Sequence, residues 1–216
     1  MPFDAVPVAT TLSEIYTSDV IESQTKRWQQ LLSTFSSTFS HSPEFVARSP
    51  GRVNIIGEHI DYSLYAVLPM AITADALIAV SFTEPSQETS SSDHFQLRIA
   101  NVQAEKFPQR EYSIPIQDTI HIDAKIHEWT NYFKCGLKGA IEALRSKYGK
   151  DFKPKSMNVL MDGSVPAGGG LSSSAAFVSA SALAVLVANG EKDVDKIMLT
   201  ELAIVSERAV GVNSGG

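Results

Sequence analysis

The sequence predicts a globular protein of mixed helix and strand, and three observations lead to this class. Apolar residues make up 44% of the 216 residues and charged residues 19%, so the chain can build a core and is neither disordered nor fibrous. Several short segments have the apolar character of strands, and longer segments have apolar residues at helical spacing. The length fits one large domain or two small ones.

Residues 1–40 are predicted to form a helical extension ahead of the main domain, which we expect over residues 41–216. The extension is rich in Ser and Thr. Across residues 25–35 its large apolar side chains recur at helical spacing, namely Trp28, Leu31, Leu32 and Phe35. This helix should therefore pack on the body of the domain.

Strands are expected in the next part of the chain, over residues 44–48, 52–57, 67–72, 76–82 and 95–99. Ser49-Pro50-Gly51 should end the first of them, and Gly57 should allow a turn after the second. The polar, Ser-rich residues 84–94 predict a surface loop.

The C-terminal half has the pattern of three helices and one strand. Apolar side chains repeat at helical spacing over residues 129–148, and further helices are expected over residues 172–188 and 194–210. Residues 157–161 are strand-like. The order of these elements favours a sheet that packs against helices.

Charge and cysteine content exclude several classes of function. The net charge is −6 and no segment concentrates Lys and Arg, so the chain lacks the basic face of a nucleic-acid-binding protein. Cys135 is the only cysteine, which is typical of a reducing compartment. The N-terminus has no secretory pattern, and the most apolar stretch, residues 175–188, is too short to span a membrane. A cytoplasmic protein is expected.

The strongest local signal is a glycine–serine loop from Gly163 to Ala176. Three consecutive glycines, Gly168 to Gly170, let the backbone curl until several N–H groups point at one anion. Ser172, Ser173 and Ser174 follow at a helix start, where the dipole favours phosphate and a hydroxyl could bind Mg²⁺. The alternative is a glycine-rich turn with a serine helix cap. The compactness of the motif favours phosphate binding.

A second signal is a polar cluster that follows the second predicted strand. Arg52, Glu58, His59 and Asp61 fall within ten residues. Carboxylates accept hydrogen bonds from paired hydroxyls, His donates or accepts, and Arg supplies a cationic fork, which together suit a sugar. A solvated turn is the alternative, and the pattern is weak for a metal site.

Together, residues 51–62 and 166–175 resemble the GHMP family of small-molecule kinases and, within it, the galactokinases. Residues 128–134 (EWTNYFK) and the last ten residues are similar to eukaryotic, fungal-type members. The resemblance runs from about Phe45 to the end of the chain, and residues 1–40 carry no matching motif.

The resemblance implies a role for each motif. Arg52 would act at the transferred phosphate and the sugar hydroxyl that receives it, as a catalytic and substrate-binding residue. Glu58, His59 and Asp61 would hold the other galactose hydroxyls. Trp129 would lie near the adenine or in the core. The triphosphate of ATP would be wrapped by Gly168, Gly169, Gly170, Leu171, Ser172, Ser173 and Ser174, and Mg²⁺ would be held by Ser174 and Glu207.

The same resemblance implies an α+β fold whose mixed sheet is covered by helices on one side. A second, C-terminal domain would close the active site, and that domain is absent from the given sequence. The chain stops at Gly215-Gly216, just before the segment that carries the catalytic base in the family, and a glycine-rich ending is itself typical of a truncated sequence. Ser63-Leu64-Tyr65 departs from the Asn-Gly-Gly of many bacterial members, at the rim of the expected sugar pocket.

The implied activity is transfer of the γ-phosphoryl group of ATP to the anomeric hydroxyl of galactose by the intact protein, with this chain inactive alone. One alternative is an N-acetylgalactosamine kinase. Another is a galactose sensor that binds a transcriptional repressor, although the intact Ser174-Ala175 pair favours a kinase. A third is an inert truncation that aggregates through an uncovered apolar face.

Overall fold

The computed structural model describes residues 4–57, 60, 63, 65–83, 93–126 and 128–211. Within these residues the strands are β1 (Phe45–Ile56), β2 (Leu68–Thr83), β3 (His94–Asn101), β4 (Arg110–Pro115) and β5 (Ser156–Gly163). The α-helices are α1 (Ile21–Phe39), α2 (Asn131–Tyr148), α3 (Ser173–Ala188) and α4 (Lys196–Glu207). Two short 3₁₀ turns, Leu12–Glu14 and Arg208–Val210, lie near the ends.

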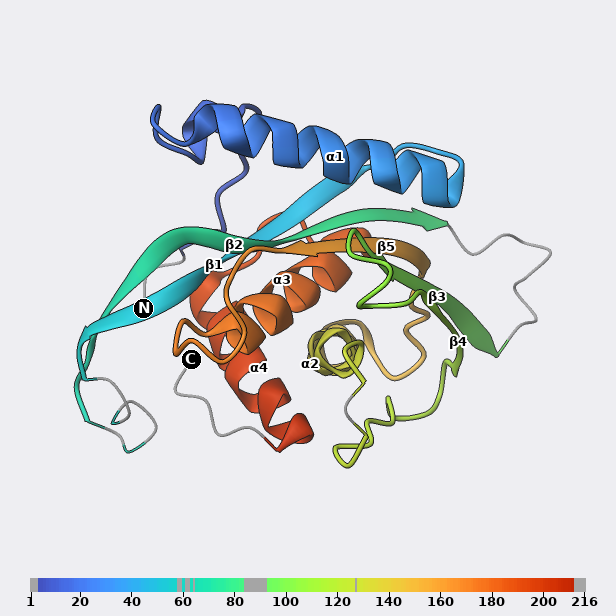
Figure 1. Cartoon of the computed structure of the whole chain (residues 1–216). Helices are drawn as coiled ribbons and strands as arrows, with labels where there is room; N and C mark the ends of the chain where they lie inside the picture. The colour runs from blue at the N-terminus through green and yellow to red at the C-terminus, as the bar shows by residue number, and fades with distance from the viewer. Residues whose placement is uncertain are drawn as a thin grey trace.

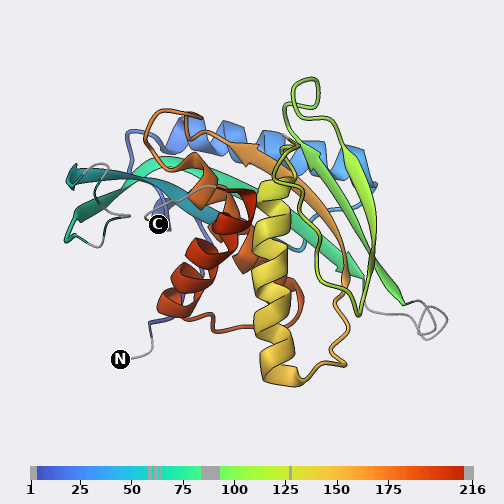
Figure 2. The ribbon, with the colours of Figure 1, turned by 90° about the horizontal axis from the view of Figure 1, so that it is seen from below.

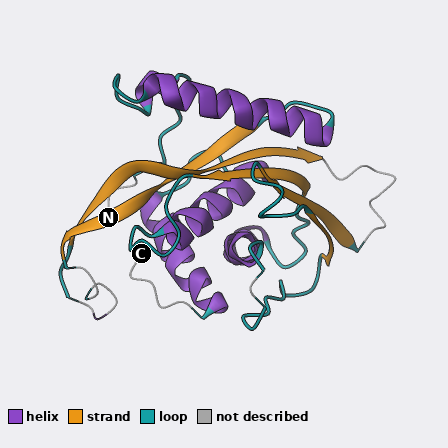
Figure 3. Ribbon diagram, in the orientation of Figure 1, coloured by secondary structure: helices purple, strands orange, loops and turns teal. Residues whose placement is uncertain are grey.

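The strands form one mixed sheet in the order β1-β2-β5-β3-β4. Only the β3–β5 pair is parallel, while the other neighbouring pairs run antiparallel. Helices α2, α3 and α4 lie on one side of the sheet, whereas α1 lies across the opposite face (Figures 1 and 3). The predicted mixed sheet with a helical layer is therefore confirmed, and the N-terminal helix adds a layer on the other face.

Strand β2 lies at the centre of two cores. Because successive side chains of a strand point to opposite faces, Ile78 and Val80 join the main core that α2 and α3 build. Leu77 and Ala79 join the smaller core under α1. In that smaller core α1 contributes Leu31, Phe35 and Phe39. Burial on both faces explains why this part of the sequence is continuously apolar.

Two predicted interruptions of the sheet are wrong. Residues 45–56 form one strand in place of two, with a register shift between Pro50 and Arg52. The strand tolerates Pro50 because β1 is an edge strand, where a missing N–H breaks no pairing on the open side. Strand β2 is likewise continuous, because the polar Asp75 in its middle is neutralised by arginines from other elements.

The predicted helices are found close to their expected bounds. The N-terminal helix extends beyond the predicted residues 25–35, and the last helix ends at Glu207 before a 3₁₀ turn. Viewed from below, α3 passes behind α2 and α4, between them and the sheet (Figure 2). None of the helices in the described segments is both long and apolar enough to cross a membrane.

Candidate functional site

The glycine–serine loop connects the end of β5 to the start of α3. Gly168 and Gly170 have φ angles of +74° and +69°, which glycine adopts at no steric cost. Ser172 has φ +59°, a left-handed conformation that is strained for a residue with a side chain and that persists mainly at functional sites. The Ser172 side chain makes no capping hydrogen bond to α3, so the alternative reading as a serine cap fails here. The first N–H groups of α3 therefore remain available to an anion.

Arg52 lies beside this loop, although about 120 residues separate the two motifs in the sequence. The Arg52 backbone N–H donates a hydrogen bond of 3.0 Å to the carbonyl oxygen of Leu171. The preceding Gly51 makes this approach possible, because a Cβ at that position would lie 2.9 Å from the same oxygen. The structure thus brings together the cores of the two sequence motifs.

The other predicted sugar-binding residues, Glu58, His59 and Asp61, lie outside the described residues. Their segment joins β1 to β2, whose last described pair is Ile56 with Leu68. At its start Gly57 has φ +108°, in agreement with the predicted turn. The segment therefore begins at Gly57, five residues after Arg52 and directly after the strand that carries Arg52.

A cavity of about 360 Å³ adjoins the loop. Its wall includes Gly168, Ser173 and Ser174 of the loop, together with the aromatic side chains of Phe107, Trp129, Tyr132 and Phe177. The Trp129 and Phe177 rings are nearly parallel, with an interplanar angle of 14° and centroids 6.3 Å apart. The Trp129 indole N–H donates to the Pro108 carbonyl at 3.1 Å, which fixes the ring. A cavity with aromatic rings in its wall, beside a phosphate-type loop, suits a purine base.

Two amide side chains at the cavity were not anticipated from the sequence. Asn101 is the last residue of β3, Gln103 follows two residues later, and both line the same cavity. The Asn101 side-chain oxygen accepts a 2.8 Å hydrogen bond from the Gln103 N–H, and its nitrogen lies 3.3 Å from the Met161 sulfur. No motif surrounds these residues, so only the pairing of β3 with β5 reveals their position.

Ser174 lies in the first turn of α3, and Glu207 is the last residue of α4, which packs against α3. Val178, one turn after Ser174, and Ala203, one turn before Glu207, belong to one buried cluster with Cys135. Glu207 is 1% exposed, and together with burial its charge raises the pKa of the Cys135 thiol to about 11. A hydroxyl and a buried carboxylate are hard oxygen donors, which Mg²⁺ prefers. Among the described residues no group of three or more His, Cys, Asp and Glu side chains gathers to hold a metal by itself.

The fold is that of the N-terminal domain of the GHMP kinases. Residues 131–216 match the family described as GHMP kinases N terminal domain. Residues 33–82 match the galactokinase galactose-binding signature. The mevalonate kinase of Methanococcus jannaschii has the same fold, with a TM-score of 0.57 at 17% identity over 77% of this chain and 46% of its own.

Relatives of known name identify the family more narrowly. A galactokinase of Candida maltosa is 38% identical over 96% of this chain and 91% of its own length. A galactokinase of Candida parapsilosis is 48% identical over 88% of this chain. The Lactococcus lactis galactokinase, solved with galactose, aligns with a TM-score of 0.66 at 25% identity over 87% of this chain and 44% of its own. The chain belongs to the galactokinase family.

This chain spans only part of most of these relatives. It covers 35% of the Candida parapsilosis protein and 39% of a Candida albicans galactokinase that is 44% identical to it.

Proposed function

We propose that the whole protein transfers the γ-phosphoryl group of ATP to the anomeric hydroxyl of galactose. The observation that carries this proposal is the contact between Arg52, within the galactose-binding signature, and Leu171 of the glycine–serine loop. A sugar site and a phosphate site that share one contact bring the acceptor hydroxyl to the phosphoryl group. Holding two reactants in this way supplies much of the acceleration in phosphoryl transfer.

The nucleotide half of the site follows from the loop and the cavity. The aromatic cavity takes the adenine, and the backbone N–H groups of residues 168–174 with the dipole of α3 hold the phosphates. Ser174 and Glu207 are the residues that would hold Mg²⁺, and Mg²⁺ neutralises charge on the phosphate oxygens when bound. Arg52 adds positive charge where the γ-phosphoryl group is transferred.

The sugar half of the site is assigned to the segment that joins β1 to β2. Glu58, His59 and Asp61 hold the galactose hydroxyls there, because carboxylates and imidazole match the donors of a sugar edge. The comparisons favour neither the N-acetylgalactosamine kinase nor the repressor-binding sensor. A cytoplasmic location stays a prediction.

Isothermal titration tests the two halves separately. We expect saturable binding of galactose but not of glucose, and its loss in Asp61→Ala. Mg·ATP should bind independently and weaken in Ser174→Ala. Asp151→Ala, at an exposed position away from the site, serves as the matched control and should leave the affinity for both ligands unchanged. Galactose binding that survives Asp61→Ala, or equal binding of glucose, would contradict the assignment of the sugar site.

A further inference from the structure

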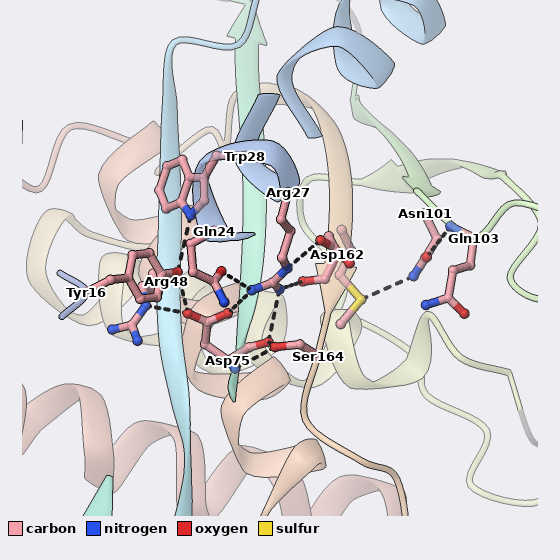
Figure 4. Close-up of polar contacts among 11 residues, drawn as sticks. Tyr16, Gln24, Arg27, Trp28, Arg48, Asp75, Asn101, Gln103, Asp162 and Ser164 are labelled. Atoms are coloured by element: carbon pink, nitrogen blue, oxygen red, sulfur yellow. Dashed lines mark hydrogen bonds and ion pairs between the residues drawn. The ribbon is translucent and has the colours of Figure 1, made fainter. Parts of the chain in front are cut away.

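A buried ion-pair network joins the N-terminal helix to the beginning of the glycine–serine loop (Figure 4). Its centre is the Asp75 side chain on β2, which is 0% exposed. Its carboxylate accepts hydrogen bonds from Arg27 at 2.5 Å, from Arg48 at 2.5 Å and from the Tyr16 hydroxyl at 2.6 Å. The donors come from α1, from β1 and from the segment before α1.

Arg27 bridges the two central strands next to the loop. Its Nη1 donates to Asp75 on β2, and its Nε donates to Asp162 on β5 at 2.7 Å. Its Nη2 also donates to the Asp162 backbone carbonyl at 3.2 Å. Burial lowers the pKa of Arg27, but the bonds to Asp75 and Asp162 outweigh it and raise the pKa above its ordinary value. One planar guanidinium therefore fixes both strands where β5 ends.

Asp75 is in turn hydrogen-bonded to Ser164, near the beginning of the loop. The Ser164 N–H donates to the Asp75 carbonyl at 2.9 Å, and the Asp75 N–H donates to the Ser164 hydroxyl at 3.0 Å. Asp75, Gly163 and Val165 also line the cavity beside the loop. The loop is thus held at both ends, by Asp75 at Ser164 and by Arg52 at Leu171.

We infer that Arg27 is a positioning residue for the glycine–serine loop and acts on it through Asp75 and Ser164. The N-terminal helix is then part of the nucleotide site and more than an accessory extension. Tyr16 and Arg27 both lie outside the two segments that match the family descriptions. The inference rests on the proposed function in one respect, namely that the loop binds the phosphates of ATP.

A merely structural network would act differently from a positioning one. Loss of a purely structural ion pair raises hydrogen exchange to the same extent in all elements, whereas loss of a positioning contact raises it most in the loop. The loop depends on this contact because it holds a strained Ser172 and two left-handed glycines, which the surrounding structure has to fix.

The first test measures amide hydrogen exchange in the ligand-free protein. In Arg27→Met we expect the exchange of peptides covering residues 163–172 to rise about tenfold more than that of peptides from α2. Arg27→Lys keeps the charge but loses the planar fork of hydrogen-bond donors, so the exchange rate of its loop peptides should lie between those of the parent chain and Arg27→Met. Lys26→Met, at the 74% exposed neighbour, is the matched control and should behave as the parent chain. Equal acceleration in α2 and the loop, or none in the loop, would overturn the inference.

The second test separates the ligands by titration. Arg27→Met should weaken Mg·ATP about tenfold and leave galactose within about twofold, because only the nucleotide loop has moved. Ser164→Ala leaves the ion pairs intact and removes only the hydroxyl next to Asp75, so it should weaken Mg·ATP binding in the same selective way but to a smaller extent. This variant serves as the test if Arg27→Met fails to fold. Ser37→Ala on the exposed side of α1 is its control. A parallel loss of both ligands would count against positioning. A parent chain that binds no Mg·ATP would contradict the assignment of the ATP phosphates to this loop in the present chain, and the exchange measurement would still decide the role of Arg27.

Discussion

Gly51 shows how a single residue allows two distant motifs to meet. Its neighbours are the Leu171 carbonyl oxygen, 2.9 Å from where a Cβ would lie, and the side chains of Val165 and Ile72 at 3.0 and 3.1 Å. Two of these three neighbours belong to the glycine–serine loop. A side chain at this position would therefore separate the loop from β1.

Gly51→Ala is expected to weaken Mg·ATP binding about tenfold, because the added methyl group displaces the loop. Overpacking of this kind should also lower the free energy of unfolding by about 1–3 kcal/mol. Titration and urea denaturation measure the two effects. Gly169→Ala is the control for stability, since its Cβ would meet only Pro166 at an ordinary 3.5 Å. Unchanged values for both quantities in Gly51→Ala would show that the strand and the loop do not depend on each other.

Cys135 gives a pH-dependent prediction at the same scale. Burial, followed by the charge of Glu207, raises the pKa of its thiol to about 11. The folded thiol therefore keeps its proton after the unfolded thiol has lost it. This contribution to stability is complete below the unfolded pKa and is lost as the pH rises through the folded value.

The free energy of unfolding should thus fall between about pH 9 and pH 11, by on the order of 2 kcal/mol from this group. Urea denaturation across this range, compared with Cys135→Ala, isolates the contribution of the thiol. The native thiol should also resist alkylation at about pH 8, where an exposed cysteine reacts. Rapid alkylation of the folded chain, or identical pH slopes for the two proteins, would show that the thiol is not held in its protonated form.

At the scale of elements, the sequence predicted helices better than strands, for a physical reason. A helix is defined by local spacing, so residues 129–148 and 172–188 could be recognised from their own apolar pattern. Strands depend on partners that are distant in the sequence. Pro50 and Asp75 looked like interruptions because the open edge of β1 and the arginines around Asp75 are invisible locally.

Strand β4 was not predicted at all. Its sequence, REYSIP, is short and half polar, and its pairing with β3 supplies the evidence for it.

The same limit applies to the candidate site. The loop and Arg52 could be located from motifs, whereas Asn101, Gln103 and Phe107 reach the cavity from segments that carry none. Glu58, His59 and Asp61 lie outside the described residues, so their roles stay predictions.

The ion-pair network that connects α1 to the sheet leads to a prediction about stability. Asp75→Ala removes the acceptor shared by Arg27, Arg48 and Tyr16 and leaves buried donors without it. Breaking a buried pair in this way should cost about 3–5 kcal/mol. Urea denaturation of this variant and of Asp151→Ala, at an exposed position, measures the difference. If the free energy of unfolding of Asp75→Ala fell no more than that of the control, the prediction would be wrong, and water would be supplying the hydrogen bonds of the missing carboxylate.

At the scale of the whole molecule, three layers converge on one loop. The helices below the sheet supply the start of α3 and the aromatic cavity, the sheet supplies Arg52 and Asp75, and α1 on the far face supplies Arg27 (Figures 1 and 4). Arg27 and Asp162 are 135 residues apart in the sequence and lie in different layers, yet they are bonded to each other beside this loop.

The strand order has a consequence for how the protein is made. Strand β5 lies between β2 and β3, although it is synthesised after β1 to β4. The hairpins β1–β2 and β3–β4 emerge first and present open edges until β5 joins them. At ordinary rates of translation the interval from Pro115 to Gly163 lasts on the order of 2–10 s. During that interval the nascent chain is exposed to edge-to-edge association, and β5, the last of these five strands to be synthesised, leads directly into the glycine–serine loop.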